Sequence, residues 1–168
     1  VFKKLKKIVV FYLFKKADKY QAFEIAGVKL KGSKGTFRTK VDKDDAWYFE
    51  LVKNSEHVFD IGSNIGYMSL LAAIQNKNKS VLLADPNPEA LAEAAQNMVI
   101  NGFGLKTKFV NAFISDKDGE KIKFYTVGTG EAGSMFSGHA ETAKAVNSYY
   151  FVSFYAVLID GRQYNNFI

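Results

Sequence analysis

Seven residues, Asp60-Ile61-Gly62-Ser63-Asn64-Ile65-Gly66, constrain the fold of this chain most, because they join two apolar patterns of different period. Before them, Val58–Ile61 is an apolar run too short for a helix, which predicts a buried strand. After them, apolar residues recur at helical spacing and predict a helix that lies against a sheet. These helix residues are Tyr67, Leu70, Leu71 and Ile74.

A second strand and helix follow directly. Val81–Ala84 is apolar and stops at Asp85-Pro86. Asn87 can then cap a helix with Pro88 at its first position, and Asn101-Gly102 is expected to end it. Its predicted buried face consists of Leu91, Ala94, Ala95 and Met98. A strand–loop–helix–strand–helix unit of this kind is the first half of a doubly wound nucleotide-binding fold.

The loop chemistry indicates which ligand the unit would take. A pyrophosphate-binding turn has the spacing G-x-G-x-x-G, whereas Gly62 and Gly66 are here separated by three residues. Asp60 would oppose a pyrophosphate but would suit a ligand with a cationic end. Asp85, 19 positions after Gly66, ends the next strand, where a carboxylate accepts from both ribose hydroxyls. S-adenosylmethionine fits best, and a nicotinamide oxidoreductase is the disfavoured alternative.

Three stretches together resemble the FkbM-type family of class I S-adenosylmethionine-dependent methyltransferases. They are VFDIGSNIGYMSLLAA, VLLADPNPEALAEAAQNMVINGF and FVNAFISDKDGEKIKFY, and the similarity covers roughly residues 40 to 160. The resemblance implies an α/β fold, a Rossmann-like doubly wound sheet of the class I methyltransferase type, apparently incomplete at the C-terminus. It also implies ribose binding at Asp85, where the family more often has Glu, and adenine contacts near Pro86 and Asn111-Ala112.

The predicted cofactor-binding residues are Asp60, Ile61, Gly62, Ser63, Asn64, Gly66, Tyr67, Asp85, Pro86, Asn87, Asn111 and Ala112. Asn111 has an equally good alternative interpretation as a residue that ends a strand. Because its amide both donates and accepts, it would suit an adenine edge.

The resemblance implies a small-molecule or glycan acceptor, since members of the family are mostly O-methyltransferases acting on hydroxyls of sugars, glycans or polyketides. The net charge of +6 and the pI near 9.3 leave RNA methylation as an alternative. We expect no nucleic-acid partner, because the lysines concentrate near the N-terminus. A third alternative is a half-domain that binds cofactor weakly without catalysis.

We expect a fragment at both ends, because the chain starts on Val1 and stops on Phe167-Ile168 in mid-pattern. The family's next motif, roughly Ile-Asp-x-Glu-Gly, is expected shortly after the last residue. The chain alone is therefore predicted to be a poor enzyme.

The sequence offers few candidate catalytic or metal-binding groups. A Gly-, Ser- and Thr-rich segment, residues 128–148, is either mobile or part of an acceptor site. It contains His139, a weak candidate for a general base, and Ser134, a weaker candidate for acceptor contact. With no cysteine and two histidines, we expect no disulfide and no metal site.

Residues 1–16 read as a basic amphipathic helix. The helix either docks on the domain with its lysines in solvent, which we prefer, or makes peripheral contact with an anionic membrane surface. Ala17–Gln21 offers no small-residue cleavage site, so we expect a cytoplasmic protein, with attachment to the inner membrane face as the alternative.

Two units are predicted: residues 1–40, with the basic helix and hairpin strands within 19–40, and residues 41–168, the N-terminal part of a methyltransferase domain. A helix from Asp42 or Asp44 should turn Trp47, Phe49 or Glu50, and Leu51 toward the fold. Glu50 either lies beside the cofactor or, as we prefer, pairs with a lysine. Further predicted elements are strands Leu105–Val110, Lys121–Val127 and Tyr149–Ile159 and a turn over Ser115–Gly119. The edge of the strand at 57–61 would be unpaired unless Tyr149–Ile159 covers it.

Overall fold

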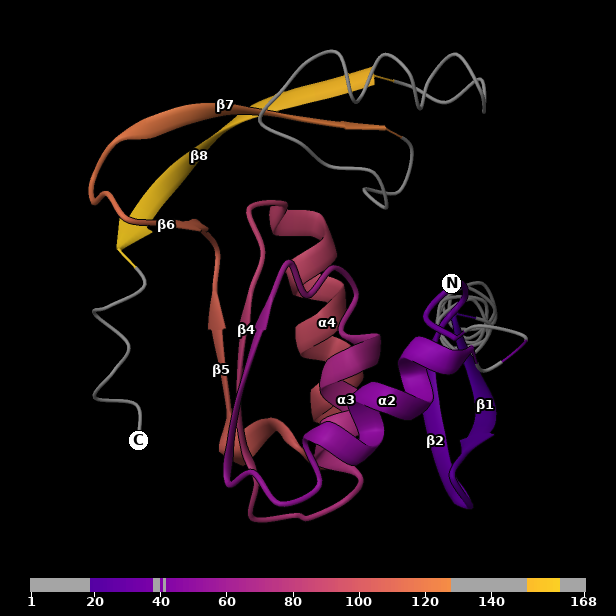
Figure 1. The fold of residues 1–168 in the computed structure, drawn as a ribbon. Coiled ribbons are helices and arrows are strands. Elements are labelled where there is room, and N and C mark those ends of the chain that lie inside the picture. Colours follow the sequence, from indigo (N-terminus) through magenta and orange to yellow (C-terminus); the bar gives the residue numbers. More distant parts are fainter. Residues whose placement is uncertain (1–18, 38–39, 41, 128–150, 161–168) are drawn as a thin grey trace, which may run out of the picture.

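The computed structural model describes residues 19–37, 40, 42–127 and 151–160 (Figure 1). The predicted helix of residues 1–16 and the candidates Ser134 and His139 lie outside these ranges. Within them, no helix combines the length and the apolar character that crossing a membrane requires.

The described structure begins with an antiparallel hairpin of β1 (Tyr20–Ile25) and β2 (Val28–Ser33), as the alternation within 19–40 predicts. Ala26 and Gly27 both have positive φ, 49° and 78°, which is the backbone of a type I′ hairpin turn. Leu30 of β2 is only 4% exposed, so the hairpin contributes to the same apolar core as the helices.

Three parallel strands form the central sheet in the order β3-β4-β5. Their bounds are His57–Ile61 for β3, Ser80–Ala84 for β4 and Thr107–Val110 for β5. The connections are α3 (Tyr67–Ala73) and α4 (Pro88–Ile100). This confirms the α/β, Rossmann-like fold class. Figure 1 shows the helices on one face of the sheet, with the hairpin beyond them.

Helix α4 starts as its sequence predicts. The Asn87 side chain accepts from the backbone N–H groups of Glu89 and Ala90 at 3.0 and 3.4 Å, and Pro88 occupies the first turn. The prediction of the buried face is wrong for one residue. Ala95 is half-buried, and Asn97 is buried in its place, because a position three residues after Ala94 stays on the same helix face.

Helix α2 (Lys43–Leu51) is capped by Asp42, and Asp45 completes a capping box. The prediction that Trp47 and Leu51 face the fold is wrong, since they are 76% and 78% exposed. The capping box turns Asp45 inward, where it is 2% exposed. Trp47 and Leu51, which are four residues apart, share a different face of the helix, and that face points to solvent. Glu50 forms an exposed ion pair with Lys53 at 3.1 Å, as the preferred interpretation predicts.

The remaining strands are β6 (Phe113–Ser115), β7 (Lys121–Val127) and β8 (Phe151–Asp160), in the order β6-β8-β7. β8 does not cover the edge of β3, and within the described residues β3 pairs with β4 alone. The predicted strand Leu105–Val110 begins later, because Gly104–Lys106 forms a 3-10 turn after α4 (Gly102 has φ 81°). In Figure 1, the antiparallel pair of β7 and β8 lies beyond the carboxyl ends of the parallel strands.

Candidate functional site

The loop between β3 and α3 is a tight left-handed turn. Gly62, Asn64 and Gly66 have positive φ values of 80°, 47° and 83°. The backbone N–H groups of Gly62 and Ser63 both donate to the carbonyl of Ala84, at 2.8 and 3.1 Å. These bonds fasten the loop to the carboxyl end of β4, where α/β folds bind their ligands.

Gly66 also brings the loop into direct contact with α4. A Cβ atom on Gly66 would lie 3.1 Å from the Cβ of Ala94 and 3.4 Å from a methyl carbon of Leu83. No larger residue fits at position 66 without a shift of the helix or the loop, so α4 supports the loop by direct contact.

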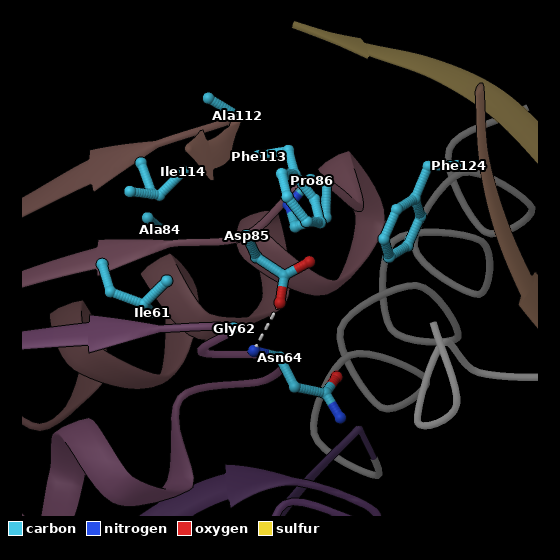
Figure 2. A pocket seen from close by; sticks show the side chains of 10 residues that line it. All are labelled: Ile61, Gly62, Asn64, Ala84, Asp85, Pro86, Ala112, Phe113, Ile114 and Phe124. Carbon is cyan, nitrogen blue, oxygen red and sulfur yellow. Dashed lines mark hydrogen bonds between the residues drawn. The ribbon is translucent and has the colours of Figure 1, made fainter. Parts of the chain in front are cut away.

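Asp85 joins the loop to the end of β4 (Figure 2). Its Oδ2 accepts from the backbone N–H of Asn64 at 2.7 Å, and its Oδ1 accepts from that of Asn87 at 2.8 Å. A carboxylate has about four acceptor positions, so about two remain for a ligand. Burial raises the pKa of Asp85 above 3.8, and the two backbone hydrogen bonds lower it in part.

Asp60 is the second carboxylate of the site. Its Oδ2 accepts from the Ser69 hydroxyl at 2.5 Å. Burial is the main cause that raises the pKa of Asp60, the hydrogen bonds from Ser69 oppose it, and the negative charge of Asp85 raises it further.

The hydroxyl of Tyr48 is buried with no hydrogen-bond partner among the described residues. Burial and then the charge of Asp60 raise the pKa of Tyr48 above its usual value, which keeps it a neutral donor.

Two cavities border the loop and share Gly62 and Asn64. The first, of about 370 Å³, is drawn in Figure 2 and is lined by Ile61, Gly62, Asn64, Ala84, Asp85, Pro86, Ala112, Phe113, Ile114 and Phe124. The second, of about 480 Å³, is lined by Gly35, Thr36, Asp60, Gly62, Ser63, Asn64, Ile65, Tyr67 and Met68. Each cavity thus contains one carboxylate, and no lysine or arginine of the described residues lines either one.

Two polar side-chain atoms of the loop are buried without a hydrogen-bond partner in the described part of the chain. They are the Ser63 hydroxyl and the Asn64 Oδ1. A buried polar atom without a partner costs about 1–3 kcal/mol, so both are suited to bind a ligand. Ser63 is 6% exposed and lines the second cavity, whereas Asn64 lines both.

Most of the predicted site residues come together at these cavities. Those that line one or both are Asp60, Ile61, Gly62, Ser63, Asn64, Tyr67, Asp85, Pro86 and Ala112. Gly66 and Asn87 line neither and instead hold the loop and the start of α4. Asn111 also lines neither, and its Nδ2 donates to the carbonyls of Asp85 and Pro86 at 2.9 and 3.2 Å. This favours the alternative interpretation of Asn111 as a residue that ends a strand.

Other lining residues were missed by sequence reasoning. Phe113, Ile114 and Phe124 form the apolar wall of the first cavity, and the rings of Phe113 and Phe124 lie 6.2 Å apart. Gly35 and Thr36 bring the end of the hairpin to the second cavity. The alternation of β7 predicts that Phe124 and Thr126 share a face, but it does not predict which element that face meets.

No protein-family model matches the chain, and no curated protein sequence matches it. Solved structures match parts of it. A SAM-dependent methyltransferase from Agrobacterium tumefaciens is 21% identical over 56% of this chain and 33% of that chain, with a TM-score of 0.44. The aTrm5 protein in complex with tRNALeu is 18% identical over 66% and 41%, with a TM-score of 0.43. TYW2 from P. horikoshii, in complex with MeSAdo, is 15% identical over 66% and 53%, with a TM-score of 0.41.

The matched regions thus span 33% to 53% of these three proteins. Likeness at this level is partial, and the fold class follows from the chain's own parallel sheet β3-β4-β5.

Proposed function

We propose that the chain is part of a class I S-adenosylmethionine-dependent methyltransferase of the FkbM type. The observation that carries this proposal is a pair of cavities that meet at one loop. One contains the buried carboxylate of Asp85, the other the half-buried carboxylate of Asp60, and no described basic residue lines either. In the proposed arrangement Asp85 accepts from the ribose hydroxyls, and Asp60 faces the cationic methionine end.

The charge of the site favours this cofactor over a dinucleotide. The pKa values of Asp60 and Asp85 are raised by burial, and Asp60 also by Asp85, so the ionised pair is costly without a cation nearby. A cationic ligand relieves this cost, whereas a pyrophosphate increases it. The two unpartnered atoms, Ser63 Oγ and Asn64 Oδ1, supply a donor and an acceptor for the polar groups of the ligand.

S-adenosylmethionine supplies a methyl group on a sulfonium centre that is already reactive toward a hydroxyl. The residues described here therefore need only bind and orient it, since proximity and alignment lower the barrier of a bimolecular step. The apolar wall of Phe113, Ile114 and Phe124 excludes water from one side of the first cavity.

The proposed acceptor is a hydroxyl of a sugar, a glycan or another small metabolite. The resemblance of the loop, Asp85 and Asn111-Ala112 stretches to the FkbM-type family supports this part of the proposal. The matched regions span only 33% and 41% of the first two solved structures reported above, and acceptor binding in the whole protein is proposed to involve residues beyond those described.

RNA methylation is the second candidate, and one observation favours it. Lys29, Lys31 and Lys34 are exposed on β2 and the turn that follows, and Lys34 lines a smaller cavity beside the loop. Binding of RNA through these lysines would weaken steeply as salt is raised, whereas binding of a neutral glycan would not.

The experiment that tests the cofactor assignment pairs two ligands with two variants. S-adenosylmethionine carries the cationic methionine end, and 5′-methylthioadenosine has the same nucleoside without it. We expect Asp60→Asn to weaken only S-adenosylmethionine and Asp85→Ala to weaken both, as measured by calorimetry. Equal weakening of both ligands by Asp60→Asn would contradict the proposed placement of the two ends.

A further inference from the structure

Asn97 is a buried amide on the face of α4 that supports the loop. It follows Ala94 by one helical turn, and Ala94 is the residue that Gly66 contacts. Its side chain is 0% exposed. Because an amide without partners is costly to bury, an asparagine at this position is expected to have all its hydrogen bonds in place.

The hydrogen bonds of Asn97 join two separate segments. Its Oδ1 accepts from the backbone N–H of Ser33 at 3.2 Å. Its Nδ2 donates to the hydroxyl of Thr36 at 3.0 Å and to the carbonyl of Ile65 at 2.9 Å. The hydroxyls of Ser33 and Thr36 lie 2.8 Å apart and complete the network. One side chain therefore links the end of the hairpin to the loop between β3 and α3.

These two segments both line the second cavity. Gly35 and Thr36 line it from the hairpin, and Gly62 to Ile65 line it from the loop. Asn97 itself does not line the cavity. Its effect on a ligand would therefore be transmitted through the positions of the two segments, because a fully satisfied buried network fixes the geometry of its members.

We propose that Asn97 is a positioning residue that sets the separation of the hairpin and the loop, and thereby the affinity of the second cavity for the methionine end of S-adenosylmethionine. This inference rests on the proposed function.

Asn101 offers a matched control on the same helix. Its Oδ1 accepts from the backbone N–H of Lys31 at 2.9 Å, and its Nδ2 donates to the carbonyl of Lys31 at 2.7 Å. It therefore fastens α4 to the same strand, β2, and its Nδ2 also donates to the backbone carbonyl of Asn97 at 2.7 Å. Among the described residues, these side-chain bonds reach β2 and α4 but not the loop.

The test compares Asn97→Asp with Asn101→Asp. Aspartate at 97 keeps an acceptor for Ser33 and for the Thr36 hydroxyl, but it loses the donor to Ile65. We expect the Kd for S-adenosylmethionine to rise at least about tenfold in Asn97→Asp, because the variant loses one hydrogen bond to a buried carbonyl and turns a carboxylate oxygen toward that carbonyl. In Asn101→Asp it should change by less than about twofold.

Hydrogen exchange adds a readout that does not depend on the ligand. The amide of Asn64, which donates to Asp85, should exchange faster in Asn97→Asp than in Asn101→Asp. If Asn97→Asp fails to fold, Asn97→Ser removes the same donor to Ile65 and serves in its place.

The outcomes separate the two proposals. If the wild-type chain binds no S-adenosylmethionine, the proposed function fails, and exchange at Asn64 alone then decides the positioning role. If the wild-type chain binds, equal affinity of the two variants would overturn the inference. Equal exchange at Asn64 in the two variants would also overturn it.

Discussion

The contact between Gly66 and Ala94 allows a quantitative prediction of how Gly66→Ala changes the free energy of unfolding. In Gly66→Ala, an alanine at φ 83° costs about 1–2 kcal/mol for its left-handed backbone. The new methyl would lie 3.1 Å from the Cβ of Ala94 and 3.3 Å from its Cα, and overpacking of this kind costs about 1–3 kcal/mol more. We therefore expect a total loss of about 2–5 kcal/mol in the free energy of unfolding, measured by urea denaturation.

Gly62→Ala separates the two causes. Gly62 has nearly the same φ, 80°, but nothing lies within 4 Å of the Cβ it would carry, so only the backbone cost of about 1–2 kcal/mol applies. In an Ala94→Gly background, Gly66→Ala should cost less than it does in the wild-type chain, by a part of the overpacking cost of about 1–3 kcal/mol, because the Cβ at 3.1 Å is gone while the Cα at 3.3 Å remains. Equal costs at 62 and 66, together with no coupling to position 94, would refute the claim that α4 supports the loop by direct contact.

Three further predictions concern charge and capping. The pKa values of Asp60 and Asp85 are raised above 3.8 in the folded chain. At these two carboxyl groups the folded chain therefore binds more protons than the unfolded chain, and the stability that this proton binding contributes is lost as pH rises through the folded pKa values. Affinity for a cation has the opposite sign, so calorimetry should show the Kd for S-adenosylmethionine rising as pH falls through this window, and rising from a higher pH in Ser69→Ala. Lys79 is 2% exposed and donates to the backbone carbonyls of Val52, the C-cap of α2, and of Ser55 in the segment that follows. Lys79→Met should therefore cost about 1–3 kcal/mol in urea unfolding, and no change would mean that these bonds are dispensable. Loss of the N-cap in Asn87→Ala should cost about 1 kcal/mol, and a neutral result would show that Pro88 alone suffices to start α4.

Local pattern was sufficient to predict the strand–loop–helix unit. The apolar run before Gly62, the helical spacing after Gly66 and the cap at Asn87 each depend on neighbours in sequence, and the structure confirms all three. The carboxylates Asp60 and Asp85 were also predicted to lie at the ends of adjacent strands, because parallel strands bring their carboxyl ends to one edge of the sheet.

Tertiary partners could not be read from the same pattern. Trp47 and Leu51 are apolar, but helix α2 turns Asp45 inward and leaves both exposed, since apolar spacing does not say which face has a partner. Asn97 is polar and fully buried because its partners come from residues 33, 36 and 65, far from it in sequence. Phe124 lines the first cavity because β7 lies beyond the carboxyl ends of the parallel strands (Figure 1).

The most direct test of the central claim is calorimetric titration of S-adenosylmethionine into this chain and into Asp85→Ala, with NAD as the control ligand. If the cofactor assignment is correct, the wild-type chain binds S-adenosylmethionine and not NAD, and Asp85→Ala weakens this binding. Binding of NAD in preference to S-adenosylmethionine, or equal affinity of a folded Asp85→Ala variant, would contradict it.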